Sequence, residues 1–497
     1  MATLAEAFAR ATRLHQVGQL SEAADVYRAI LAAVPDHAPS LHLLGVIAAQ
    51  NRRLEPAETL IRRAIALDDG NADFHSNLGA VLREQGRLEE ASDCLVLALA
   101  LAPGQLDARH NLGAVLHDQG RLEQAEDCYR AVIDRQPNHV AALTSLGALL
   151  SASGQIDQAE FWLGRALALA PDDSEAHWSL AVTRLLAGNL AGGWAEFDWR
   201  WRRPGLVPRR FVEPRWRGQP LAGQTILLHA EQGRGDTIQF ARYASLVQAR
   251  GGRVIVQCQT ELVGLLGTLA GVEAVVGNHQ TPPPFQWQAS LLDLPGAFGT
   301  TLETIPAATP YLTAEPSRVA RWRQRLSGGG ISVGLAWAGT STHRNDRNRS
   351  LTLATLASLL APLLGLPSVR WFGLQVGPRA ADLTAAGLSD RITDLSGEIA
   401  DFRDTAAMVA ALDLVISVDT AVVHLAGALA RPAWVLLPFA PDWRWLLGRS
   451  DSVWYPGLRL FRQPRPGAWA EVIAEVAQAL ESAATTGTDD EFKLLRT

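Results

Sequence analysis

The side chains best suited to chemistry in this chain stand where apolar runs give way to polar residues. One apolar run, 412–418, is followed by Asp419 and Thr420, and a helical pattern then begins at Ala421. The first amides of a helix and the positive end of its dipole attract an anion, so a pyrophosphate is the expected ligand. His424 lies one turn into the helix and is expected to face the same ligand. A lone helical histidine is more often structural, and only this strand–Asp–Thr–helix context favours binding.

A second polar segment follows the apolar run 331–337 and extends to residue 350. Glycine admits close approach of the backbone to a ligand, and arginine offers forked donors to phosphate oxygens. The alternative is a solvated polar loop with no ligand. A glutamine after the next apolar run can meet a ribose or a base. The expected donor-binding residues in this region are Trp337, Gly339, Arg347, Arg349 and Gln375.

A third candidate segment follows the apolar run 225–230. Gly233 and Gly235 allow a ligand to approach the backbone closely, and Asp236 stands at the start of a helical pattern. A carboxylate in that position is either a helix cap or a general base. The residues alone leave both interpretations open.

The elements that carry these residues alternate between apolar runs and helical patterns from about residue 222 onward. Such alternation predicts parallel sheets with helices on both faces, and ligands of such sheets bind at the carboxyl ends of the strands. The expected strands are 225–230, 253–258, 272–276, 331–337, 369–374, 412–418 and 433–437. The expected helices are 237–249, 351–361, 378–387, 404–411, 420–429 and 468–483. We assign 222–310 and 318–483 to two α/β halves and 484–497 to a disordered tail.

The first part of the chain repeats itself with a period of 34 residues. Leu-Gly pairs recur at Leu44-Gly45, Leu78-Gly79, Leu112-Gly113 and Leu146-Gly147. The pattern resembles the tetratricopeptide repeat, a helix–turn–helix unit, and it gives five units over 4–173. Such arrays stack into a superhelix with a concave face.

Two asparagines at one repeat position suggest what that face would bind. Asn77 and Asn111 each precede a Leu-Gly pair, and an amide on the concave face can bond a peptide backbone. We therefore expect a groove for a protein partner or acceptor. The alternative is a scaffold that only dimerises or positions its neighbour.

Residues 174–221 read as a degenerate sixth repeat followed by a segment rich in Arg and Trp. A buried aromatic seam that joins the repeats to the next domain is the favoured interpretation. Binding of single-stranded nucleic acid and an electrostatic funnel for an anionic cosubstrate are the alternatives.

Composition excludes several classes of protein. Hydrophobic residues make up 48% of the 497 residues and charged residues 19%, which is not the composition of a disordered chain. The three cysteines form no CxxC pair, so we expect neither a disulfide scaffold nor a zinc ribbon. We find no signal peptide and no membrane span, so a cytoplasmic location is expected. The charge balance gives no reason to expect nucleic-acid binding.

Two motifs carry a family resemblance. Asp419-Thr-Ala-Val-Val-His-Leu-Ala426 resembles the Asp-Thr-x-x-x-His-Leu-Ala signature of bacterial heptosyltransferases, and Gly235-Asp236 resembles their Gly-Asp near the first helix. The resemblance implies a GT-B fold of two Rossmann-like halves, a nucleotide-sugar cosubstrate, no metal or other cofactor, and inversion at the sugar carbon. It implies that Asp236 is the catalytic base and that Arg349, or failing it Arg347, contacts the donor phosphates.

The whole chain is similar to the bacterial tetratricopeptide-repeat glycosyltransferases. The pairing of repeats with this module also resembles the O-linked N-acetylglucosamine transferases and the flagellin glycosyltransferases. These resemblances imply O-glycosylation of a protein, with flagellin as an example. The alternatives are a transferase for lipopolysaccharide or capsule glycans and a scaffold whose module has lost catalysis.

Overall fold

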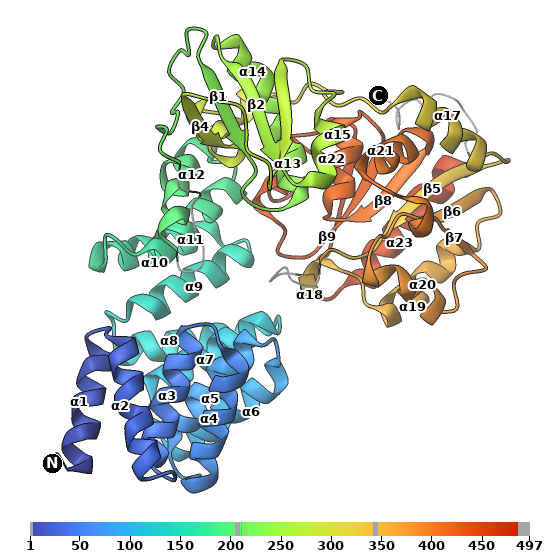
Figure 1. The fold of residues 1–497 in the computed structure, drawn as a ribbon. Helices are drawn as coiled ribbons and strands as arrows, with labels where there is room; N and C mark the ends of the chain where they lie inside the picture. The colour runs from blue at the N-terminus through green and yellow to red at the C-terminus, as the bar shows by residue number, and fades with distance from the viewer. Residues whose placement is uncertain (1–2, 204–208, 210, 341–345, 486–497) are drawn as a thin grey trace. The chain divides into compact units, whose positions relative to one another are not determined.

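The computed structural model describes residues 3–203, 209, 211–340 and 346–485. Residues 341–345 of the predicted donor loop and most of the expected tail lie outside the described residues. The chain divides into two compact units, one ending at Ala176 and the other beginning at His177 (Figure 1). Each unit is described by itself below.

The first unit is a stack of antiparallel helix pairs with the predicted 34-residue period. Its core is made by small residues, because Ala23, Ala57, Ala91 and Ala125 are fully buried where paired helices meet. A Cβ on Gly79 would lie 2.6 Å from Leu95 Cγ, so only glycine permits this approach. The helices are α1 (Leu4–Gln16), α2 (Leu20–Ala33), α3 (Ala38–Gln50), α4 (Leu54–Leu67), α5 (Ala72–Glu84), α6 (Leu88–Leu101), α7 (Leu106–Asp118), α8 (Leu122–Arg135), α9 (Val140–Ala152) and α10 (Ile156–Leu169).

The helix pair that follows the repeats is continued in the second unit. Helix α11 (Ser174–Leu186) spans the division, and α12 (Leu190–Phe197) and η1 (Asp198–Arg202) belong to the second unit. Trp194 on α12 donates from Nε1 to the Thr300 carbonyl at 2.9 Å. The predicted degenerate repeat thus packs on the α/β part of the chain through its second helix.

The first sheet of the second unit is parallel, in the order β3-β2-β1-β4. Its strands are β1 (Thr225–His229), β2 (Arg253–Cys258), β3 (Val272–Gly277) and β4 (Trp287–Ser290). The sequence did not predict β4, because Trp-Gln-Ala-Ser contains no apolar run. The connecting helices are α13 (Arg234–Phe240), η2 (Ala241–Tyr243), α14 (Ala244–Ala249), η3 (Thr260–Leu262), α15 (Val263–Leu266), η4 (Leu291–Asp293), α16 (Leu294–Ala297) and η5 (Leu302–Thr304). The single helix predicted at 237–249 is wrong, since η2 separates α13 from α14.

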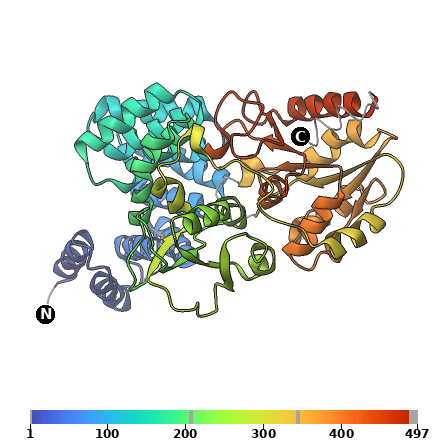
Figure 2. The ribbon, with the colours of Figure 1, turned by 90° about the horizontal axis from the view of Figure 1, so that it is seen from above.

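The second sheet is also parallel, in the order β10-β9-β8-β5-β6-β7. Its strands are β5 (Ile331–Ala336), β6 (Val369–Gly373), β7 (Ile392–Asp394), β8 (Leu414–Val418), β9 (Ala433–Leu437) and β10 (Leu458–Arg462). Strands β7 and β10 were not predicted, because one has only three residues and the other alternates apolar residues with arginine. Figure 2 shows this sheet and the first as separate groups of strands.

Helices cover the second sheet on both faces, and α23 and α19 pack together on one of them. The helices are α17 (Pro316–Arg325), α18 (Asp346–Arg349), α19 (Leu353–Leu364), η6 (Pro378–Ala381), α20 (Asp382–Ala385), η7 (Ser396–Glu398), α21 (Phe402–Ala411), α22 (Ala421–Ala428), η8 (Trp443–Trp445) and α23 (Trp469–Thr485). A repeat solenoid followed by an α/β module, as predicted, is confirmed. Among the described residues, no helix has both the length and the apolarity needed to cross a bilayer.

Candidate active site

The candidate site lies at the carboxyl ends of β5 and β8, which are neighbours at the centre of the second sheet. After β5 the chain continues to β6 on one side, and after β8 it continues to β9 on the other. Ligands of open α/β sheets bind at such a change of direction. The segments that meet there are those singled out in the sequence, the loop beginning at Trp337 and the turn at Asp419 and Thr420.

The turn after β8 presents the start of α22. Thr420 occupies the N-cap position, but its side chain makes no capping hydrogen bond and lies 3.1 Å from the Ser417 hydroxyl. The first-turn amides therefore lack a side-chain cap, which leaves this helix end suited to an anion. His424 is buried one turn further on, with Nε2 3.8 Å from Asp419 Oδ1.

Arg349 reaches this turn from α18. Its Nη1 donates to the Asp419 carbonyl at 3.2 Å, and its Nε lies 3.5 Å from Asp346 Oδ1. Gly339 makes room for the guanidinium, because a Cβ there would stand 2.8 Å from Arg349 Cζ and from Asp346 Oδ1. The arginine is thus held beside the start of α22.

The loop after β1 brings Asp236 to the same place from the first sheet. Asp236 is the third residue of α13, and its Oδ2 accepts the Gly233 amide at 2.8 Å. A Cβ on Gly235 would lie 2.8 Å from His424 Cδ2, so α13 and α22 pack directly together (Figure 1). The cap interpretation of Asp236 is correct locally, and its other oxygen remains available to a second partner.

That second partner is Arg444, a residue that the sequence analysis did not single out. Its Nη2 donates to Asp236 Oδ1, and its Nη1 donates to Asp442 Oδ1 at 2.8 Å. The sequence offered one signal, the unusual Asp442-Trp-Arg-Trp segment soon after a buried strand.

Burial sets the protonation of the three titratable groups around the start of α22. Desolvation, together with the nearby Asp442 carboxylate, raises the pKa of Asp419 to about 6. Desolvation also raises the pKa of Asp236, while the Arg444 guanidinium opposes that rise. The pKa of His424 falls well below its usual value, because the imidazole is buried among arginines. His424 is therefore neutral at physiological pH.

A buried group behind His424 was also missed in the sequence. The Tyr455 hydroxyl lies 3.0 Å from His424 Nδ1, and the guanidinium of Arg242 stands over the Tyr455 ring at 4.4 Å. Arg242 comes from the first sheet's side and donates to the Trp454 carbonyl at 2.6 Å. These contacts fix the orientation of the His424 ring from the side opposite Gly235.

Two predicted donor residues are placed in the core beside the site. Trp337 is fully buried, and its Nε1 donates to Asp382 Oδ2 at 3.2 Å. Gln375 accepts from the backbone amides of Trp337 and Ala338 through its Oε1, at 3.2 and 3.0 Å. Both therefore hold the start of the donor loop in place. Arg347 lies on α18, two residues before Arg349.

The predicted peptide-binding residues lie in the first unit and not at this site. Asn77 is half-buried on α5, with Nδ2 2.8 Å from His42 Nε2, and Asn111 is half-buried on α7.

Within the described residues, no group of three or more potential metal-ligating side chains comes together.

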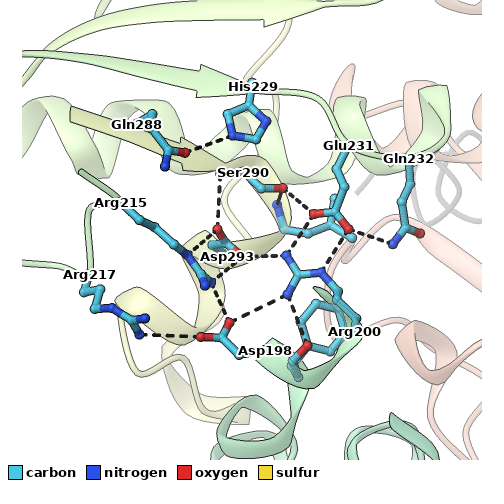
Figure 3. A network of polar contacts seen from close by, with 12 residues as sticks. Asp198, Arg200, Arg215, Arg217, His229, Glu231, Gln232, Gln288, Ser290 and Asp293 are labelled. Atoms are coloured by element: carbon cyan, nitrogen blue, oxygen red, sulfur yellow. Dashed lines mark hydrogen bonds and ion pairs between the residues drawn. The ribbon is translucent and has the colours of Figure 1, made fainter. Parts of the chain in front are cut away.

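A buried ion network holds Glu231, which lies in the loop between β1 and α13 (Figure 3). Arg200 on η1 is fully buried and donates to both oxygens of Glu231, at 2.9 and 2.8 Å. It also donates to Asp293 at 2.5 Å, and Ser290 donates to Glu231 at 2.6 Å. Within the Arg- and Trp-rich segment, Arg200 is thus buried in an ion network.

Models of known families match both parts of the chain. The tetratricopeptide-repeat models match residues 8–72, 71–136 and 104–172. A model of glycosyltransferase family 9 (heptosyltransferase) matches residues 375–436, which include Gln375 and the turn from Asp419 to His424. The chain thus joins tetratricopeptide repeats to a segment that matches the heptosyltransferase family.

The chain is similar to one curated protein and to several solved structures. It is 30% identical over 349 residues to Protein FlbA of Caulobacter vibrioides, covering 64% of this chain and 57% of that protein. The structure of PilF of Pseudomonas aeruginosa matches with a TM-score of 0.35 and 20% identity, covering 41% of this chain and 92% of PilF. The structure of the repeat protein TTC0263 of Thermus thermophilus matches with a TM-score of 0.32 and 18% identity, covering 35% of this chain and 95% of TTC0263.

Proposed function

We propose that this protein transfers a sugar from a nucleotide-sugar donor to a hydroxyl group of a protein that its repeats bind. The observation that carries the proposal is the packing of α13 on α22, which brings Asp236 beside the uncapped first turn that follows Asp419. A base for the acceptor and a site for the leaving diphosphate are thereby next to each other. We infer a GT-B arrangement, because two parallel sheets contribute to this one site.

In this proposal the diphosphate of the donor lies on the first amides of α22, at Thr420 and Ala421. Arg349 adds its guanidinium charge, and the neutral His424 borders the same turn. Preorganised amides and guanidinium groups stabilise the charge that develops on a departing diphosphate. The proposal therefore needs no metal ion.

Transfer would occur in one displacement. The acceptor O–H gives its proton to Asp236, and the acceptor oxygen forms a bond to the anomeric carbon. The bond from that carbon to the diphosphate oxygen breaks, and its electron pair leaves with the diphosphate. Attack from the face opposite the leaving group inverts the anomeric centre.

The first helices of successive repeats offer a polar row for the acceptor. Asn77 pairs with His42 of the preceding repeat, and His110 Nε2 lies 3.0 Å from the Ser145 hydroxyl of the following one. Burial lowers the pKa of both histidines to about 4, so the row is uncharged at neutral pH. Neutral donors and acceptors of this kind suit a peptide backbone, and flagellin is one acceptor that fits the proposal.

A thermal-shift screen against UDP, ADP, GDP, CMP and their sugar conjugates tests the donor site. One nucleotide at about 100 times its dissociation constant should stabilise the protein by about 2.7 kcal/mol. We expect Arg349→Ala and Thr420→Val to reduce that stabilisation, because each alters the start of α22. Arg253→Ala, at an exposed ion pair on β2, should leave it unchanged. Absence of a shift with every nucleotide would contradict the donor site and favour a non-catalytic scaffold.

Removal of residues 1–173 tests the protein acceptor. The second unit begins at His177, so we expect the truncated protein to keep its nucleotide-induced stabilisation and to lose protein glycosylation. The double variant Asn77→Ala and Asn111→Ala should weaken glycosylation in the same direction, and the exposed Asn138→Ala should not. An unchanged set of glycoproteins with an altered lipopolysaccharide or capsule profile would overturn the protein acceptor in favour of a glycan.

A further inference from the structure

Arg444 is a buried cation in contact with the proposed base. It lies on η8, after β9, and its side chain is only 8% exposed. Its guanidinium donates to Asp236 on α13 and to Asp442 on its own turn, while its buried Nε has no hydrogen-bond partner. Arg444, which follows a strand of the second sheet, thus binds the Asp236 carboxylate, which follows a strand of the first sheet.

Aromatic rings hold the Arg444 guanidinium in this position. It stands 4.5 Å from the centre of the Trp443 ring and 5.3 Å from that of Phe240. Trp443 is itself packed against Trp194 and Phe197 of α12, with ring centres 5.4 and 6.4 Å apart. The arginine is therefore preorganised, and little side-chain entropy remains to be lost when it binds a carboxylate.

Among the described residues, the charged groups that act most strongly on Asp236 are one cation, Arg444, and two anions, Asp442 and Glu231. The Gly233 amide from its own turn and Arg444 from η8 both favour the ionised form. Asp442 from η8 and Glu231 from the loop after β1 disfavour it, as does burial. His424 of α22, against Gly235, is neutral and contributes no charge. Arg444 is thus the cation in contact with a carboxylate that burial and two other anions would protonate.

We propose that Arg444 is a positioning residue that keeps Asp236 ionised and correctly oriented as the base, so that the acceptor hydroxyl can be deprotonated near neutral pH. The inference rests on the proposed function. When Asp236 takes the acceptor proton, the charge of Arg444 is still balanced by Asp442. Each carboxylate oxygen has two lone pairs, so Asp236 can accept from the acceptor hydroxyl without losing Arg444.

The pH dependence of kcat/KM for sugar transfer tests this role. In Arg444→Met we expect the acidic limb of the kcat/KM profile to move to higher pH by about one unit or more. At pH values below that limb, kcat/KM should be about tenfold lower than in the wild type. Arg444→Lys keeps a cation and should restore most of the wild-type profile. Asp442→Asn removes an anion and should move the limb in the opposite direction. In an Asp236→Asn background, Arg444→Met should not alter the profile of the residual rate.

Two further outcomes separate this inference from the proposed function. A lower rate in Arg444→Met at every pH, with the acidic limb unmoved, would overturn the role of Arg444 and leave the glycosyltransferase proposal standing. If the wild type transfers no sugar, the proposed function fails, and thermal unfolding at pH 8 then decides about Arg444. There, Asp236→Asn should raise the melting temperature of Arg444→Met if Arg444 is what stabilises the buried carboxylate. Additive effects of the two substitutions would overturn the inference.

Discussion

Asp236→Asn is expected to lower the rate of sugar transfer by about 10²- to 10⁴-fold, the usual contribution of a general base. An amide has no proton affinity at neutral pH, but its oxygen can still accept the Gly233 amide that now bonds to Asp236. The start of α13 should therefore survive, and nucleotide binding at α22 should be nearly unchanged. Initial rates with a saturating donor, together with the thermal shift produced by the nucleotide, measure the two effects separately.

A matched control lies on the same side of the site. Glu261→Gln also converts a carboxylate to an amide, at an exposed ion pair with Arg234 of α13. It should retain the wild-type rate. A rate in Asp236→Asn within a few fold of wild type would show that another group, or water, deprotonates the acceptor.

Arg200→Met should destabilise the second unit by about 3–5 kcal/mol, because it leaves the buried Glu231 carboxylate without its cation and leaves Asp293 with Arg215 alone. The side chains of Glu231 and Asp293 are only 4% exposed, and both bind Arg200. Contacts with Arg200 and Ser290 lower the pKa of Glu231 despite its burial. The stability that this provides is present above the ordinary glutamate pKa and is lost as pH falls through the lowered value. The difference in free energy of unfolding between wild type and Arg200→Met should therefore become smaller at acidic pH.

Differential scanning calorimetry at several pH values measures this effect. Arg253→Met is the matched control, since Arg253 also makes two hydrogen bonds to one carboxylate, that of Glu273, but on the surface. It should leave the melting temperature unchanged, because water screens and replaces an exposed ion pair. Equal melting temperatures for the Arg200 and Arg253 variants would mean that the network in Figure 3 does not stabilise the loop before α13.

The sequence by itself determined the parts of this protein that depend on neighbours along the chain. Each repeat packs mainly on the next one, so a period of 34 residues with glycine at Gly45, Gly79 and Gly113 is enough to predict the helix pairs. Strand β9 is a fully buried apolar run, and β2 is buried from Val254 to Cys258; both were predicted with their observed bounds. The turn at Asp419 and Thr420 was also evident, because strand, turn and helix start are consecutive.

Elements without a local signal were missed. Strand β7 has three residues, and β4 is half polar, so neither stands out from its surroundings. The residues from Thr237 to Ala249 have a continuous helical pattern, yet the chain bends at η2, where Arg242 and Tyr243 are buried by other parts of the fold. Trp337 was expected at the ligand because it ends a strand, but packing placed its ring in the core.

Only the tertiary structure decided which charges meet. Arg444 and Asp236 are 208 positions apart, and Arg200 and Asp293 are 93 positions apart. No sequence spacing predicts such contacts, because they depend on how the two sheets and the helices α11 and α12 fold together. An ion pair gains its strength from burial, and burial is a property of the folded chain rather than of any segment. The sequence therefore predicted a carboxylate at the start of α13, but the contact of that carboxylate with Arg444 is seen only in the folded structure.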